Sequence, residues 1–162
     1  MDFDALRQTE VFADAPPEVT KLFAYLAGHR VVQPGEFVLR QGALADSCYF
    51  VIRGEVDIII LHNGQEIVVQ RIHEKSFFGE LALLARFKWF FFARAVSEAE
   101  LLIVTRESFR KVLERFPERR DTLTEKVIQL RISRFENQTS SLLDRLTEAG
   151  IAAGDAGRPL ID

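Results

Sequence analysis

The sequence has a single cysteine, Cys48, and only three histidines among its 162 residues. One cysteine excludes an intrachain disulfide and a thiolate metal cluster, because each needs at least two thiols. The histidines, His29, His62 and His73, lie too far apart for a local metal-binding motif. We therefore expect no metal site, and the lack of disulfides fits a reducing cytoplasm.

Long apolar runs and catalytic motifs are missing as well. No apolar run approaches the ~20 residues that span a bilayer, and the N-terminus MDFDALRQTE has acidic residues where a secretory signal has a basic start and an apolar core. No nucleophile elbow, P-loop or dinucleotide fingerprint occurs, so we expect no enzyme. A net charge of −3 provides no overall attraction to nucleic acid. These absences predict a soluble, cytoplasmic protein.

The residues that are present predict one folded domain, mainly of β-structure. Apolar residues make up 48% of the chain and charged residues 28%, an ordinary globular balance. After an α-helical entry, short β-rich runs are separated by turn residues, namely Pro34-Gly35, Gly42, Gly54 and Asn63-Gly64. Asn63-Gly64 is the signal for a tight hairpin. Successive short strands favour a sandwich or a closed barrel over alternating βαβ units.

Two helices are expected at the C-terminal end. Thr105 is placed to cap the first of them, and Pro117 to begin a second that runs to about Ala149, where Gly150 stops it. The second helix carries a heptad seam of alternating spacings of four and three, namely Ile128, Ile132, Phe135, Thr139, Leu142 and Leu146. The seam either packs on the chain's own barrel or joins two chains, and a mixture of both also fits. We expect a homodimer through this helix.

Several short motifs occur in a fixed order, namely Pro34-Gly35-Glu36, Arg40-Gln41-Gly42, Tyr49-Phe50-Val51-Ile52, Gly54-Glu55-Val56 and FGELALL at 78–84. In this order and spacing the sequence resembles the cyclic nucleotide-binding domain family over roughly residues 6–146. That family includes catabolite-activator-type regulators, protein kinase A regulatory subunits and gated channels. The resemblance implies an α+β, mainly β fold: a jelly-roll-like β-roll, or double-stranded β-helix, with N-terminal helices and two C-terminal helices.

The expected organisation has four parts: an N-terminal helical segment (1–28), a β-roll (29–105) with the ligand cassette at 77–95, C-terminal helices (106–149) and a flexible tail (150–162) rich in glycine and alanine. Family members that regulate transcription continue into a helix-turn-helix. Only about a dozen residues follow the long helix, so direct DNA binding is not expected. We expect instead a regulatory module that acts through contacts with another protein.

The cassette begins as an anion-binding turn. Gly79 permits a tight turn, and the ELALL helical turn after it has free N–H groups that favour an anion. The resemblance assigns a ribose hydroxyl to Glu80; the alternative is that Glu80 only caps its own short helix. The candidate ligand-binding residues at family cassette positions are Phe78, Gly79, Glu80, Leu81, Ala82, Leu83, Trp89, Phe90 and Phe91.

The second half of the cassette departs from the family. Nucleotide-binding members have a proline, then an arginine that binds the cyclic phosphate, then small residues. An ungapped alignment puts Lys88 at the proline, Trp89 at the arginine, and Phe90 and Phe91 at the small positions. Charge-assisted hydrogen bonds contribute ~1.5 to 3 kcal/mol each, so binding of cAMP or cGMP is predicted to be weak or lost. Alternatively, a cation elsewhere binds the phosphate; the candidates are Arg86, Lys88 and Arg94.

Three roles remain open for the aromatic run. The side chains fill the pocket themselves, or they line an apolar cavity for a different ligand. In the third role, Phe87, Trp89 and an outward phenylalanine beside Arg86 and Lys88 form an exposed patch for a protein partner or a membrane surface. At least one of the consecutive phenylalanines must point inward and one outward, because side chains alternate along a strand. No cofactor is expected beyond a cyclic nucleotide or another small ligand.

Overall fold

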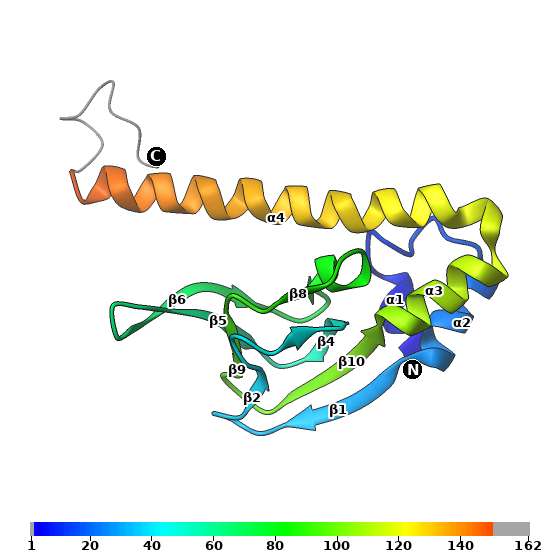
Figure 1. Cartoon of the computed structure of the whole chain (residues 1–162), viewed down its shortest axis with the longest axis horizontal. Helices are drawn as coiled ribbons and strands as arrows, with labels where there is room; N and C mark the ends of the chain where they lie inside the picture. The colour runs from blue at the N-terminus through cyan, green and yellow to red at the C-terminus, as the bar shows by residue number, and fades with distance from the viewer. Residues whose placement is uncertain (1, 151–162) are drawn as a thin grey trace.

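The computed structural model describes residues 2–150 (Figure 1). The helices are α1 (Asp2–Arg7), α2 (Pro17–Leu26), α3 (Arg106–Arg115) and α4 (Arg120–Glu148), with short 3₁₀ turns η1 (Glu80–Leu83) and η2 (Pro117–Arg119). The strands are β1 (Gly28–Val32), β2 (Phe37–Leu39), β3 (Leu44–Ala45), β4 (Ser47–Arg53), β5 (Val56–His62), β6 (Gln65–Ile72), β7 (Phe77–Phe78), β8 (Phe87–Lys88), β9 (Phe92–Ala95) and β10 (Ala99–Thr105). The predicted flexible tail lies, from residue 151 onward, outside the described residues.

The strands form two four-stranded antiparallel sheets, in the orders β1-β10-β4-β7 and β2-β9-β5-β6, and a separate β3-β8 pair. The two sheets enclose one core, and the helices lie outside it. This arrangement confirms the predicted α+β fold, a β-roll with N-terminal and C-terminal helices.

Local sequence signals account for the main boundaries. Asn63 and Gly64 have φ values of 51° and 76°, so both central residues of the β5–β6 turn are left-handed, as a tight hairpin requires. The Thr105 hydroxyl accepts a 3.0 Å hydrogen bond from the Ser108 amide and caps α3, as predicted. Pro117 begins the short turn η2, and α4 follows directly from it.

Two cores lie on opposite faces of β4. Tyr49 and Val51 point into the roll between the two sheets. Cys48 and Phe50 point outward, into a second core that also contains residues of β10 and of all four helices. Because both faces are covered, SCYFV is buried at every position instead of at alternating ones. The second core attaches the helices to the roll.

Helix α4 runs along the side of the roll for most of the length of the molecule (Figure 1). Its first turns are attached through Leu123 and Val127, which are buried in the second core. The heptad seam lies on a different face: its large residues Ile128, Ile132, Phe135 and Leu142 are 44–59% exposed, whereas Thr139 and Leu146 are half-buried. The interpretation that the seam packs on the chain's own roll is therefore wrong for the four exposed residues. No helix among residues 2–150 is long and apolar enough to cross a membrane.

Candidate functional site

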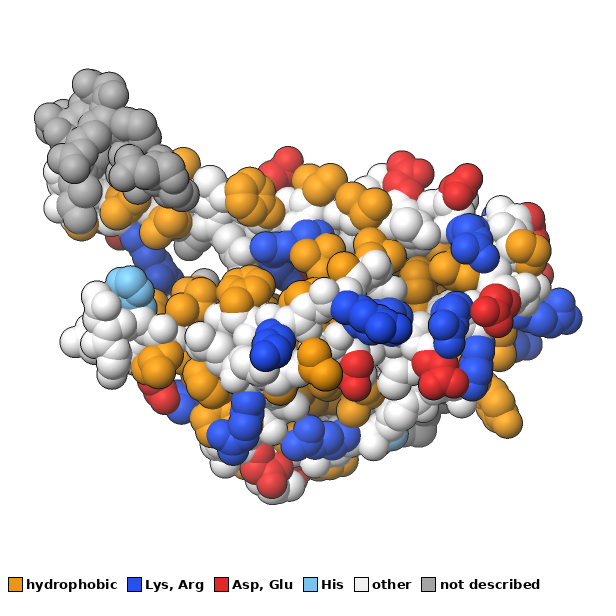
Figure 2. All heavy atoms as spheres, viewed as in Figure 1, with side chains coloured by type: hydrophobic (Ala, Val, Ile, Leu, Met, Phe, Trp, Pro, Cys, Tyr) orange, Lys and Arg blue, Asp and Glu red, His pale blue; other side chains and the backbone are white. Residues whose placement is uncertain are grey.

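A cavity of about 340 Å³ lies between the roll and α4, visible as a hollow beneath the C-terminal half of the helix in Figure 2. It is lined by strands β5 and β6, by the segment from Phe78 to Phe91, and by one face of α4. The lining residues are Ile58, Ile60, Ile67, Val68, Val69, Gln70, Phe78, Gly79, Glu80, Leu81, Phe87, Trp89, Phe90, Phe91, Arg131, Arg134, Gln138, Ser141, Leu142 and Arg145. The aromatic run therefore lines an open cavity and does not fill it.

Strand alternation determines which side chains of the cassette form the floor of the cavity. Between positions 87 and 95, odd-numbered side chains point inward and even-numbered ones outward, so Trp89 and Phe91 are buried while Lys88 and Phe90 are exposed. The pairing of β8 with β3 determines which of these side chains point inward. A 2.9 Å hydrogen bond from the Trp89 amide to the Ala43 carbonyl extends this pairing by one residue. An exposed aromatic patch is wrong for Phe87 and Trp89, since Phe87 is half-buried and Trp89 buried.

Trp89 packs directly on the cassette turn. Gly79 has a φ of 73°, and a β-carbon added to it would lie 2.8 Å from Cη2 of Trp89 and 3.3 Å from the carbonyl oxygen of Ser47. Gly79 is the residue before η1, so the indole covers the beginning of the turn where the family resemblance places a phosphate.

Replacing Gly79 with alanine is expected to lower the free energy of unfolding by about 2 to 3 kcal/mol, because a left-handed φ costs an L-residue about 1 to 2 kcal/mol and the new methyl meets Trp89. Gly64→Ala is the matched control: its φ of 76° is similar, and nothing lies within 4 Å of the added carbon. Urea denaturation of both variants measures the difference. Equal losses would contradict the close packing of Trp89 on this turn.

Glu80 is held by α4. Its side chain is 2% exposed, and Oε2 lies 2.6 Å from Nη1 of Arg134, whose own side chain is 14% exposed. Nη2 of Arg134 also donates to the carbonyl oxygen of Phe77. Oε2 of Glu80 accepts from Arg134 and Oε1 accepts from no described residue, so Glu80 does not cap its own turn and the capping interpretation is wrong. Oε1 of Glu80 is buried and has no hydrogen-bond partner among residues 2–150.

The three predicted phosphate contacts lie elsewhere. None of the three, Arg86, Lys88 and Arg94, lines the cavity. Lys88 points outward from β8, and Arg94 on β9 pairs with Glu66 at 3.1 Å. The proposal that one of them binds a phosphate in the cavity is therefore not supported by the geometry.

The cationic side chains that do line the cavity come from α4, namely Arg131, Arg134 and Arg145. Sequence reasoning missed them because it considered only the seam on that helix. Their spacings of three and eleven residues, with Gln138 between them, place all of them on one face beside the seam, and this pattern was the signal that could have found them.

Most of the predicted cassette residues are brought together at the cavity. Seven of them line it: Phe78, Gly79, Glu80, Leu81, Trp89, Phe90 and Phe91. Ala82 and Leu83 do not, since Ala82 belongs to the core of the roll and Leu83 packs against the second core.

Arg106 fixes the other end of the turn. Its Nε donates to the carbonyl oxygen of Ala82 at 2.7 Å, and its Nη2 donates to the carbonyl oxygens of Ala45 and Ala85 at 2.5 and 2.8 Å. These bonds connect the start of α3 to the cassette, so α3 and the turn are held as one unit. No local pattern in the sequence pointed to this role.

Cys48 is buried in the second core, and the charges of Glu80 and Arg134 act on its thiol. Burial raises the pKa of the Cys48 thiol far above its usual range, and the Glu80 carboxylate raises it further, while Arg134 opposes the change. The thiol is therefore a neutral core group and not a nucleophile.

No cluster of metal-ligating side chains occurs in the part of the chain that the structure describes.

The family model for the cyclic nucleotide-binding domain matches residues 29–116, more than half of the sequence. The chain therefore belongs to the cyclic nucleotide-binding domain family. The match contains both halves of the cassette and the strands that form the floor of the cavity.

Similar proteins agree with this assignment. The potassium/sodium hyperpolarization-activated cyclic nucleotide-gated channel 4 of Homo sapiens is 30% identical over 137 residues, covering 84% of this chain and 11% of the channel. The chain spans about 15% or less of the length of the curated channels it matches.

Two solved structures show the same fold. The catabolite activator protein of Thermus thermophilus is 27% identical with a TM-score of 0.68, over 85% of this chain and 62% of that one. A cyclic nucleotide-binding domain from Methylobacillus flagellatus has a TM-score of 0.78 at 15% identity, over 89% and 82% of the two chains; at that identity the likeness concerns the fold alone.

Proposed function

We propose that this chain is a non-enzymatic regulatory module of the cyclic nucleotide-binding domain family whose site binds cAMP and cGMP weakly or not at all. One observation carries the proposal: Trp89, which the ungapped alignment puts at the position of the family's phosphate-binding arginine, is buried and packs on Gly79 at the start of the cassette turn. An indole has one N–H donor and no charge, so it cannot replace a guanidinium that binds a phosphate with two hydrogen bonds.

Two further features support the proposal. The exposed alternatives Arg86 and Lys88 lie outside the cavity lining. Glu80, which the resemblance assigns to the ribose, already pairs with Arg134, and a nucleotide would compete with that buried ion pair. Loss of the two hydrogen bonds from the arginine guanidinium to the phosphate alone weakens binding by roughly two to four orders of magnitude.

Isothermal titration with cAMP and cGMP tests the proposal. We expect no heat of binding from the wild type at micromolar protein concentration. The double variant Trp89→Arg with Phe90→Ala restores the family's residues at two positions, and we expect it to gain measurable cAMP binding. The matched control is Phe90→Ala alone, which changes an exposed residue and leaves the arginine missing. Micromolar or tighter binding by the wild type would overturn the proposal.

The output of the module is proposed to be the pairing of two α4 helices along the heptad seam. The exposed seam residues recur at the spacing of a two-stranded coiled coil, so the fitting partner is a second copy of the same helix. Because Leu142 both belongs to the seam and lines the cavity, the contents of the cavity and the pairing of α4 are expected to affect one another.

Sedimentation velocity tests the dimer. We expect the wild type to sediment as a dimer and Phe135→Glu as a monomer, since a charge in an apolar seam is unfavourable. Ser140→Glu adds the same charge at an exposed position of α4 outside the seam, and it should leave the dimer intact. A wild type that stays monomeric at high concentration would contradict this output.

A further inference from the structure

We infer that the cavity beneath α4 binds a small, mainly apolar molecule that carries one anionic group. The inference rests on the proposed function, in which the family's ligand site is retained and cyclic nucleotides are not its ligands. It is carried by a cavity of about 340 Å³, which lies in the range of small-molecule sites, by its apolar floor, and by the cationic face of α4 above it.

The floor has almost no polar groups. It is formed by aliphatic side chains of β5 and β6 and by the rings of the cassette, namely Ile58, Ile60, Val68, Phe78, Phe87, Trp89 and Phe91. Trp89 and Phe91 lie with their centroids 5.3 Å apart, and Phe87 meets Trp89 edge to face. A ligand on this floor gains by burying apolar surface and by contact with aromatic faces, whereas a nucleotide's ribose and phosphate would lose hydrogen bonds to water without replacement.

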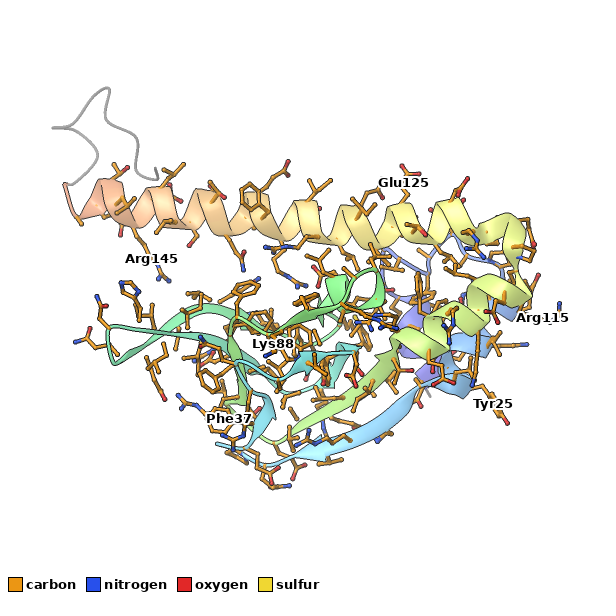
Figure 3. The ribbon with its side chains drawn as sticks, in the orientation of Figure 1. Tyr25, Phe37, Lys88, Arg115, Glu125 and Arg145 are labelled. Carbon is orange, nitrogen blue, oxygen red and sulfur yellow. The ribbon has the colours of Figure 1, made fainter. Side chains whose placement is uncertain are left out.

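The roof is cationic. The charged residues of the lining are three arginines against one glutamate, a net charge of +2. Arg134 is neutralised by Glu80, but Arg131 and Arg145 make no ion pair or side-chain hydrogen bond with any residue from 2 to 150. Figure 3 shows Arg145 extending from α4 toward the roll, while Glu125 points away from it. Unpaired guanidinium groups beside an apolar floor favour a carboxylate, sulfonate or phosphate.

Spacing along α4 indicates how the ligand lies. Arg131 and Arg145 are fourteen residues apart, about 21 Å at 1.5 Å per residue. They therefore stand at opposite ends of the roof, with Gln138 and Leu142 between them. One anionic group reaches one of these arginines, and the apolar body of the ligand lies along the floor beneath the middle of the helix.

Glu80 limits the ligand to one anionic group at one end. Its carboxylate is already paired with Arg134 through Oε2, so the middle of the roof presents a neutral ion pair and no free cation for a second anionic group. A dianionic molecule is therefore disfavoured in the centre of the cavity, and a monoanionic amphiphile is favoured.

Trp89 is the only tryptophan of the chain and lines the cavity, so its fluorescence reports occupancy directly. The probes are decanoate and 1-adamantanecarboxylate, an extended and a compact monoanion, each compared with its alcohol, 1-decanol or 1-adamantanemethanol, below micellar concentrations. We expect a saturable change in Trp89 emission with at least one acid, at a Kd at least about tenfold lower than that of its alcohol, as one charge-assisted contact provides. Failure of both acids to saturate, or equal affinity of acid and alcohol, would overturn the inference.

Variants locate the anionic group. Arg131→Gln with Arg145→Gln should raise the Kd of the acid about tenfold or more, toward that of the alcohol, and leave the alcohol unchanged. Arg86→Gln is the matched control, because it removes an exposed arginine outside the cavity lining and should change neither. An equal effect of the control and the double variant would also overturn the inference.

The same titration with cAMP separates the two claims. If neither cAMP nor either acid gives a saturable change in Trp89 emission, the inference is overturned and the proposed function stands. Micromolar binding of cAMP removes the proposed function, whatever the acids do.

Discussion

Replacing Arg134 with methionine is expected to lower the free energy of unfolding by about 3 kcal/mol, in the range measured when one partner of a buried ion pair is removed. Oε2 of Glu80 loses its partner at 2.6 Å, and with a side chain only 2% exposed the carboxylate cannot recover the loss from water. The carbonyl of Phe77 loses a donor at the same time. Urea denaturation followed by circular dichroism, at one protein concentration, measures the loss.

Arg131→Met is the matched control for this variant. Arg131 is on the same face of α4 and lines the same cavity, but it has no ion-pair partner among the described residues. Its replacement should cost less than about 1 kcal/mol. The double variant Glu80→Gln with Arg134→Met should recover part of the loss, because no buried charge then remains. Similar losses for Arg134 and Arg131 would contradict the assignment of Arg134 as the residue that holds α4 on the cassette.

Replacing Trp89 with alanine is expected to cost about 3 kcal/mol or more, as truncation of a large buried aromatic does. Trp89 is 4% exposed and packs on Phe87, Phe91 and Gly79. Its removal enlarges the cavity and leaves the floor with fewer contacts. Thermal and urea unfolding followed by circular dichroism measure the effect, since the variant lacks the only tryptophan.

Phe90→Ala is the control within the same segment. Phe90 is the next residue along the chain and is 56% exposed, so its truncation should cost no more than about 0.5 to 1 kcal/mol. Equal losses would contradict the difference in burial described for these two residues, and a larger loss from Phe90→Ala would mean that the phase of the strand is the opposite one.

Much of the fold follows from local sequence. The Asn63-Gly64 hairpin and the Thr105 cap are set by residues within a few positions of one another, and both appear where they were predicted. The family motifs predicted the roll and the helices around it, because together they mark the turns at which its strands begin and end.

The site depends on contacts between distant residues, and these were predicted less well. Strand alternation required one inward and one outward phenylalanine in the run, but pairing of β8 with the distant β3 decides which is which. Arg134 lies 54 residues from Glu80, and no local pattern joins them. The heptad pattern predicted only the apolar seam of α4, whereas the face that lines the cavity is the charged one beside that seam.

The central claim is that the cassette turn no longer receives a cyclic phosphate, and the most direct test is a titration of the wild-type protein with cAMP followed by ¹H–¹⁵N amide NMR. The amides of Gly79, Glu80 and Leu81 form the start of the turn on which Trp89 packs. We predict that their resonances, and the Trp89 indole resonance, stay in place up to millimolar cAMP. Saturable shifts of these amides at micromolar cAMP would mean that the phosphate still binds there and would contradict the account.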